Sequence, residues 1–223
     1  KPSSAASDVY KRQLLTRLSP NDLSNKAFPY MTHREVEIGD TVARAARISY
    51  IGELGWELYV PSEAALPLYD RLYEAGAVLG LENAGSFAMA GLRIEKGYCA
   101  WGHDIGPDDT PLQAGMGFAT KLSANSPFTG RTALEQQREA GLNRGRILLS
   151  VDDPEVILMG LEPILIGGDI RGYTTSAAYG YSAGRSVAIG YISLDGDSAE
   201  NVVTLGGFEI EAALTPGSYT HLR

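Results

Sequence analysis

Glu57 is the first side chain whose place in the sequence could serve chemistry. It lies in the segment 47–60, R-I-S-Y-I-G-E-L-G-W-E-L-Y-V, two residues after Gly55 and next to Trp56. A carboxylate that faces a pocket can accept two parallel N–H bonds from a planar ligand. Carboxylates are also common on the solvent-facing side of strands, so the spacing leaves an exposed Glu57 open as the alternative.

A second group of candidates lies in the glycine-rich stretch 97–117, which contains Tyr98, Trp101, His103 and Asp104. Binding residues concentrate in loops on a rigid scaffold. The Tyr98 ring could stack on a planar ligand or pack on the core. We interpret His103-Asp104 as a turn closed by local hydrogen bonds, because a zinc site needs more Cys or His at ligand spacing. No metal is therefore expected here.

A β-hairpin is expected to position Glu57. Trp56, Leu58 and Val60 alternate with Glu57 and Tyr59, which is the period of a half-buried strand. Gly52 and Gly55 predict a turn between this strand and the segment 42–50. An earlier strand is predicted over 32–38, with a turn at Gly39-Asp40.

Four helical segments are predicted around these strands. A short helix or a turn is predicted to start at Ser19-Pro20, and a helix follows Val60 with Ser62 as its candidate N-cap, although Pro67 would remove a donor inside it. The others cover 83–96 and 131–139, the last between Thr129 and Gly141. The segment 117–122 is predicted to be a strand.

The pattern changes near residues 143–145, and we predict a domain boundary there. Short strands separated by Gly and Asp turns are typical of a small barrel or sandwich. They are predicted over 147–151, 163–166, 173–179, 186–192, 201–204 and 208–213. The predicted domains are 14–143, which is α+β, and 144–217, which is all-β.

Composition limits the classes of partner. The net charge is −8 and the pI is about 4.9, which argues against a general surface for nucleic acid or for an anionic membrane. We find no apolar run long enough to span a bilayer. Cys99 is the single cysteine, so no intrachain disulfide is possible, and an intracellular compartment is compatible with this.

Several motifs, in one order, resemble a known family. Four of them resemble signatures of the aminomethyltransferase family, the T-protein of glycine cleavage and its relatives. They are Y-I-G-E-L-G-W-E-L-Y-V, L-R-I-E-K-G-Y, W-G-H-D-I and T-P-L-Q-A-G. Within this family, four features look most like the C-terminal half of dimethylglycine and sarcosine dehydrogenases. They are R-I-E-K, the tryptophan of W-G-H-D, Y-T-T-S-A-A-Y-G-Y-S and G-R-S-V-A-I-G-Y. The resemblance runs from about Leu14 to about Pro216. It implies an α+β fold, the C-terminal part of a T-protein-like folate-binding domain followed by a small all-β barrel.

The resemblance also implies site residues and cofactors. Glu57 matches the glutamate that binds the pterin of tetrahydrofolate. Tyr50 matches the tyrosine that begins the motif, Tyr98 matches an aromatic residue that flanks the folate, and all three are expected to bind the cofactor. Met89 departs from the T-protein pattern, because it stands where those proteins have the arginine of A-R-D; the dehydrogenase branch is also apolar there. The family's catalytic aspartate would lie upstream, outside this chain, and in the dehydrogenases an FAD domain would lie further upstream.

The implied reaction transfers the one-carbon unit of an imine, derived from an N-methyl amine substrate, to tetrahydrofolate, which forms 5,10-methylenetetrahydrofolate and releases the demethylated amine. The chain alone is expected to be inactive. The parent protein is expected in the cytoplasm if it is bacterial, or in the mitochondrial matrix if it is eukaryotic. A stand-alone T-protein, a related demethylase and a non-catalytic folate-binding regulatory module are the alternatives. Residues 1–13 and 218–223 resemble translated adaptor sequence, so we expect both ends to be non-native.

Overall fold

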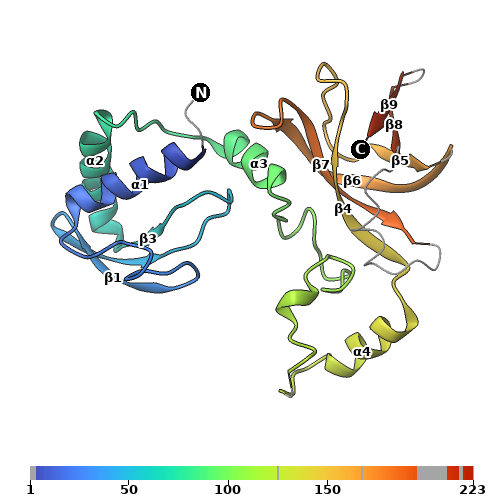
Figure 1. Cartoon of the computed structure of the whole chain (residues 1–223), viewed down its shortest axis with the longest axis horizontal. Helices are drawn as coiled ribbons and strands as arrows, with labels where there is room; N and C mark the ends of the chain where they lie inside the picture. Colours follow the sequence, from blue (N-terminus) through green and yellow to red (C-terminus); the bar gives the residue numbers. More distant parts are fainter. Residues whose placement is uncertain (1–3, 125, 167, 195–209, 216–217, 223) are drawn as a thin grey trace. The chain divides into compact units, whose positions relative to one another are not determined.

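The computed structural model describes residues 4–124, 126–166, 168–194, 210–215 and 218–222. The chain divides into two compact units, Lys1–Met89 and Ala90–Arg223, and each is described by itself. Figure 1 shows the elements of each unit. The predicted domains, 14–143 and 144–217, follow the change in strand pattern instead, and that division stays a prediction.

The first unit is a three-stranded antiparallel sheet in the order β1-β2-β3, with two helices (Figure 1). Its elements are α1 (Ser4–Leu18), β1 (His33–Ile38), β2 (Thr41–Ala46), β3 (Glu57–Tyr59) and α2 (Ser62–Ala77). One face of the sheet is buried because its apolar residues alternate along the strands. The core consists of Leu15, Leu23, Phe28, Val36, Ile38, Ala43, Ala45 and Leu68, with Trp56 and Leu58 packed against it.

Both predicted hairpins are confirmed. β1 pairs with β2 through a turn at Gly39-Asp40, with Ile38 opposite Thr41. β2 pairs with β3 so that Ala46 lies opposite Glu57. The connection between them covers residues 47–56 and is longer than the tight turn that two glycines suggest. Its start is fixed to the sheet, because the Arg47 amide donates to Thr32 O over 2.8 Å.

Of the two alternatives predicted at Ser19-Pro20, a short helix or a turn, the structure has the turn. The helix α1 ends at Leu18, and the Ser19 hydroxyl accepts from the Asn21 amide in the turn that follows. The predicted N-cap of the next helix was wrong. Ser62 is the first helical residue of α2, and Pro61 is the N-cap. Pro67 lies inside α2, which continues to Ala77. The second predicted helix is α3 (Ser86–Glu95), shorter at both ends than expected.

The second unit is built on a six-stranded antiparallel sheet in the order β4-β7-β6-β5-β8-β9 (Figure 1). Its elements are the end of α3, η1 (Gly117–Ala119), α4 (Arg131–Ala140), β4 (Arg144–Ser150), β5 (Pro163–Ile166), β6 (Asp169–Gly180), β7 (Arg185–Ser193), β8 (Ile210–Thr215) and β9 (Ser218–Leu222). The predicted all-β C-terminal part is confirmed, and the described strands form an open sheet. The predicted strand 201–204 and residues 208–209 lie outside the described residues.

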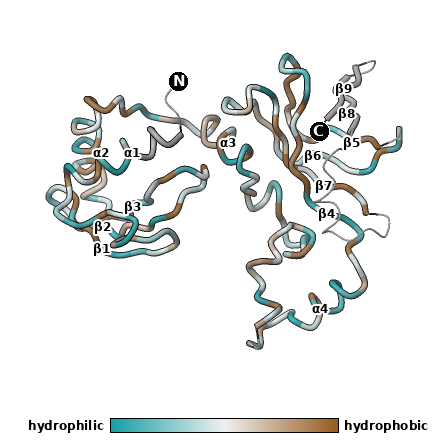
Figure 2. The backbone as a smooth tube through the Cα atoms, viewed as in Figure 1, coloured by the Kyte–Doolittle hydropathy of each residue, from teal (hydrophilic) through white to brown (hydrophobic). Residues whose placement is uncertain are grey.

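β7 is the central strand of the core of this unit. Seven consecutive residues, from Ser186 to Ile192, are buried, and Figure 2 shows β7 as largely hydrophobic and α4 as largely hydrophilic. The main core contains Leu142, Leu149, Val151, Leu158, Ile164, Ala188, Ile192 and Leu194. A smaller cluster joins Ile94 of α3 to Val187 and Ile189 of β7, so the end of α3 is anchored on the sheet.

One predicted strand in this unit was wrong. The segment 117–122 contains the short 3-10 helix η1, and Lys121 follows it at a φ of 46°. The Thr120 hydroxyl donates to Gly117 O over 2.7 Å. Such local bonds close a turn and compete with strand pairing. The predicted helix 131–139 is confirmed as α4, between Gly130 and Gly141.

Candidate functional site

Tyr50 and Glu57 line one hollow in the first unit. The hollow has a volume of about 350 Å³ and is bounded by the connection between β2 and β3, by β3 and by α1. Its walls are mostly apolar side chains. The lining residues are Lys11, Leu14, Leu15, Ile48, Ser49, Tyr50, Ile51, Leu54, Gly55, Trp56, Glu57 and Leu58.

The Glu57 carboxylate is held at the first residue of β3. The side chain is half-buried, and its Oε2 accepts a hydrogen bond from the hydroxyl of exposed Tyr59. This hydrogen bond and the negative charge of Glu57 raise the pKa of Tyr59. Oε1 accepts no hydrogen bond from any residue that the structure describes. The carboxylate therefore has one oxygen with open acceptor capacity at the wall of a hollow.

Trp56 also lines this hollow, and its indole nitrogen is an unpaired donor. Its indole Nε1–H is buried and has no hydrogen-bond partner among the described residues. The ring is fixed by Phe28, at 6.4 Å between ring centroids, and by the Arg47 guanidinium at 5.4 Å. Arg47 is itself buried and donates to Phe28 O over 2.6 Å. A buried donor without a partner is costly, so this N–H lowers the stability of the first unit.

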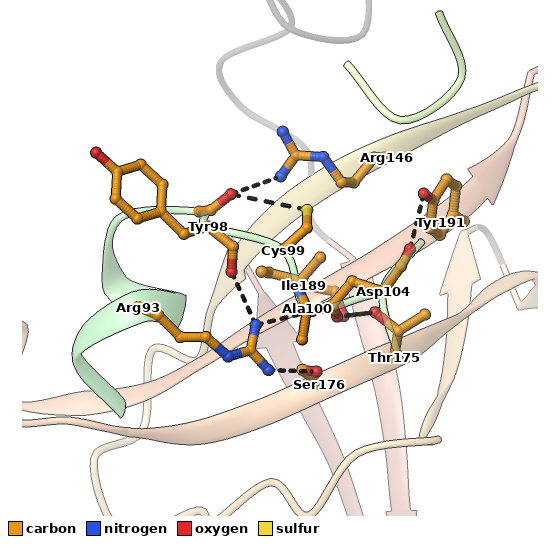
Figure 3. A network of polar contacts seen from close by, with 11 residues as sticks. Arg93, Tyr98, Cys99, Ala100, Asp104, Arg146, Thr175, Ser176, Ile189 and Tyr191 are labelled. Carbon is orange, nitrogen blue, oxygen red and sulfur yellow. Dashed lines mark hydrogen bonds and ion pairs between the residues drawn. The ribbon is translucent and has the colours of Figure 1, made fainter. Parts of the chain in front are cut away.

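Tyr98 belongs to the second unit. It follows α3, and Arg93 holds its backbone at both polar groups: the Tyr98 amide donates to Arg93 O over 2.9 Å, and Arg93 Nη1 donates to Tyr98 O over 2.8 Å. The Tyr98 ring points away from the surrounding polar network (Figure 3). The structure thus brings Tyr50 and Glu57 together in one hollow, and places Tyr98 in the loop that follows α3 in the second unit.

Sequence reasoning missed the polar network around Arg93 and Asp104 (Figure 3). Arg93 Nη1 lies 2.7 Å from Asp104 Oδ2, and the two side chains are 8% and 0% exposed. Arg93 Nη2 donates to Ser176 Oγ over 2.9 Å. The Asp104 carboxylate also accepts from the Thr175 hydroxyl at 2.5 Å and from the Ala100 amide at 2.8 Å. Every oxygen of this buried carboxylate is therefore paired.

The electrostatics of Asp104 follow from these partners. Burial alone raises the pKa of its carboxyl group, but the hydrogen bonds from Thr175 and Ala100 and the charge of Arg93 together lower that pKa below its usual value. Tyr191 donates its hydroxyl to Asp104 O over 2.9 Å. Burial, followed by the charges of Asp109 and Cys99, raises the pKa of Tyr191 to about 12. The Asp104 carboxylate therefore stays ionised, and the Tyr191 hydroxyl stays neutral, over a wide pH range.

The predicted turn at His103-Asp104 is confirmed, since both amides donate to Ala100 O. Asp104 does more than close this turn, because its carboxylate joins the turn to α3 and β6. The signal was present: Arg93 stands next to Ile94 in an apolar stretch of α3, where an unpaired arginine would be costly. Within the described ranges, no three metal-binding side chains gather in one place, and no helix is long and apolar enough to cross a membrane.

Comparisons with known proteins agree with this architecture. Residues 11–124 match the GCVT N-terminal domain model, and residues 144–216 match the glycine cleavage T-protein C-terminal barrel domain. The chain is 41% identical over 215 residues to human mitochondrial sarcosine dehydrogenase, covering 95% of this chain and 23% of that protein. It is 38% identical over 186 residues to rat mitochondrial dimethylglycine dehydrogenase, covering 83% and 22%.

A solved structure gives the same result. The glycine cleavage system aminomethyltransferase T from Bartonella henselae superimposes with a TM-score of 0.75 at 25% identity, covering 98% of this chain and 55% of that one. The chain spans about a quarter of the length of the dehydrogenases it matches. One family model covers more than half of the chain, and a second covers most of the remainder. The chain therefore belongs to the glycine cleavage T-protein family, as an aminomethyltransferase-like region related to sarcosine and dimethylglycine dehydrogenases.

Proposed function

We propose that this chain is the tetrahydrofolate-binding, one-carbon-transfer part of a larger dehydrogenase of N-methyl amines. The observation that supports this most directly is the Glu57 carboxylate, with an open oxygen at the wall of an apolar hollow. A pterin ring is planar and presents adjacent N–H donors, which suit one carboxylate in a bidentate arrangement. The family and the two dehydrogenase relatives supply the reaction class.

The residues of the hollow fit such a ligand. Tyr50, the Trp56 ring and the leucine and isoleucine walls suit a flat aromatic face. Tyr98 is proposed to contact the same class of ligand through its ring. Tetrahydrofolate, when bound, supplies N5 as the acceptor of the one-carbon unit and yields 5,10-methylenetetrahydrofolate.

The chain's own contribution is binding and orientation. Glu57 would fix the pterin edge, and the apolar walls would keep water from a reactive one-carbon unit. The amine would be oxidised by an FAD domain further upstream in the parent protein. The family's catalytic aspartate would lie between that domain and this chain. We propose the mitochondrial matrix as the location if the source is eukaryotic, and the cytoplasm if it is bacterial.

The test is titration of tetrahydrofolate into the chain and its Glu57→Gln variant. Gln keeps the shape but turns one acceptor oxygen into a donor that would face a ring N–H. A charged hydrogen bond is worth about 1.5–3 kcal/mol, so Kd should rise roughly 10- to 150-fold. Glu35→Gln is the matched control, because Glu35 is exposed on β1. An unchanged Kd in Glu57→Gln would return Glu57 to the exposed alternative and refute the site.

The genomic sequence upstream of this chain separates the readings of the parent protein. A G-x-G-x-x-G flavin motif supports the dehydrogenase. A start codon shortly before a catalytic aspartate supports a stand-alone T-protein or demethylase. An upstream half that lacks this aspartate supports a folate-binding regulatory module.

A further inference from the structure

We propose that the second unit carries a further binding site, for an organic acid with one carboxylate and a small apolar body. The site is a hollow between η1 and the start of α4, lined by residues from Pro111 to Leu134, with a volume of about 630 Å³. This volume lies in the range of small-molecule sites. All of the lining residues belong to the second unit, so the inference is independent of the hollow that Glu57 lines and goes beyond the proposed function.

The apolar side of the hollow determines the body of the ligand. Its side chains come from the loop before η1, from η1 itself, and from the loop and first turn of α4; they are Pro111, Ala119, Phe128, Ala133 and Leu134. The Phe128 ring is 37% exposed, and an aromatic ring is a favourable surface for a flat ring of a ligand. These walls favour a flat hydrocarbon body of the size of one aromatic ring.

Lys121 determines the charge of the ligand. It is exposed and lines the same hollow as the hydroxyls of Ser126 and Thr129. In the part of the chain that the structure describes, the Lys121 ammonium and these two hydroxyls make no hydrogen bond or ion pair. A carboxylate only accepts hydrogen bonds, so it can pair with an ammonium and with hydroxyl donors. The hollow therefore suits an anion.

One negative charge fits the hollow better than two. Lys121 is the single cation among the described lining residues. A second negative charge on the ligand would find no second partner there, in a chain whose net charge is −8. A carboxylate with an apolar body therefore matches the hollow better than a phosphate group does.

The backbone holds Lys121 at a conformational cost. Its φ is 46°, in the left-handed region that residues with a Cβ rarely adopt, and its carbonyl oxygen accepts from the Ala124 amide over 2.9 Å. Residues in this region cluster at ligand sites, where the surrounding structure holds them in place. Glycine would form this turn without strain. A lysine at this position is explained if its side chain is needed in the hollow.

Arg131 fixes another part of the wall before any ligand binds. Its guanidinium donates to Leu122 O over 2.8 Å and to Ser126 O over 3.0 Å. Its Cζ lies 5.9 Å from the centroid of the Phe128 ring. A wall that is already ordered lets a ligand bind without the entropic cost of ordering it. Because Arg131 is engaged by the loop, Lys121 is the cation that meets the carboxylate.

The test is titration of para-fluorobenzoate into the whole chain, followed by fluorine NMR. We expect saturable binding with a Kd of about 1 mM or below, as for a fragment of this size. Lys121→Gln should raise this Kd about five- to tenfold, because the charge of the donor is lost. Lys26→Gln is the matched control, since Lys26 is exposed in the first unit, and it should change the Kd less than about twofold.

Two further measurements separate a ligand-binding lysine from a structural one. Uncharged para-fluorobenzamide keeps the ring of the probe, and it should bind the unsubstituted chain and Lys121→Gln about equally. Lys121→Gly removes the strain at this turn, so it should melt at the same temperature as the unsubstituted chain or higher. It should nevertheless lose affinity for para-fluorobenzoate as Lys121→Gln does.

Several results would overturn the inference. They are shifts that do not saturate, an equal Kd in Lys121→Gln and the unsubstituted chain, a loss of the benzamide as large as that of the benzoate, or a lower melting temperature in Lys121→Gly. Displacement of the probe by an equal concentration of inorganic phosphate would overturn the assigned ligand class, because a simple anion would then be enough. Tetrahydrofolate binding at Glu57 is tested separately and stands or falls by its own titration.

Discussion

Replacing Asp104 with Ala should destabilise the second unit strongly. Removing one partner of a buried ion pair costs about 3–5 kcal/mol, because the remaining charge is left uncompensated, and Arg93 is only 8% exposed. The change also leaves the Ala100 amide and the Thr175 hydroxyl without this acceptor. These losses overlap, so we expect a total of about 4 kcal/mol in the free energy of unfolding.

The measurement is urea-induced unfolding, followed by circular dichroism and by Trp101 fluorescence in a Trp56→Phe background. Asp152→Ala is the matched control in the same unit. Asp152 and Arg185 lie 3.3 Å apart but are 38% and 40% exposed, so its loss should cost about 0–1 kcal/mol. Equal destabilisation by the two variants would refute the argument that burial makes the Asp104 interaction strong.

The Arg93–Asp104 pair also predicts how the stability of the second unit changes at low pH. The pKa of Asp104 is lowered in the folded chain, so its contribution to stability is present above the carboxyl's ordinary value of 3.8 and is lost as pH falls through the lowered folded pKa. The difference between the unsubstituted chain and Asp104→Ala should therefore stay constant from pH 7 to about pH 5. A difference that already shrinks between pH 7 and pH 5 would contradict the lowered pKa.

Three other changes test the packing of the two units. Phe28→Ala should cost about 3–5 kcal/mol in urea unfolding of the first unit, because Phe28 is 1% exposed. Gly172→Ala should cost about 1–3 kcal/mol or more, measured by thermal melting, because a Cβ there would lie 1.8 Å from Tyr191 O. The pKa of Tyr191 is raised to about 12, so stability should fall as pH rises from 10 through 12, and Tyr191→Phe should remove that loss in alkaline unfolding.

The hairpins and the C-terminal strands could be predicted from the sequence because their signals are local. Alternation of apolar and polar residues fixes which face of β1 and β2 is buried, and the Gly39-Asp40 turn fixes their register. The boundaries of β5, Pro163–Ile166, were predicted at both ends. Each of these features depends on neighbours within a few residues, so no knowledge of distant contacts was needed.

The errors occurred where one local signal has two meanings. Ser followed by Pro marks a helix start, but Pro is also common just after a helix ends. Because residues 1–13 resemble adaptor sequence, no helix was expected to end at Leu18, and the signal indicated the start of a short helix or a turn. The segment 117–122 contains residues suited to a strand, yet it pairs with no other strand among those described and closes local hydrogen bonds instead.

The site residues also differ in whether their contacts are local or distant in the sequence. Tyr50 and Glu57 come from one motif, so the prediction that they meet needed only a hairpin. The contact between Arg93 and Asp104 joins two motifs, and their partners Thr175 and Ser176 lie more than seventy residues further along the chain. A charge inside an apolar helical stretch indicates that a partner exists but does not say which carboxylate it is.

The difference between the buried and the exposed residues bears on why a motif is shared within a family. In R-I-E-K and W-G-H-D, the buried members Arg93 and Asp104 bind each other, and Glu95 accepts from the Ser182 and Ala183 amides. The exposed member of the same stretch, Trp101, has no such structural task in the network. A motif can therefore be shared because its polar residues hold a loop in place, while the residue that meets a ligand is one of its less polar neighbours. Substituting the buried residues and the exposed rings separately, with stability and affinity both measured, distinguishes these two reasons residue by residue.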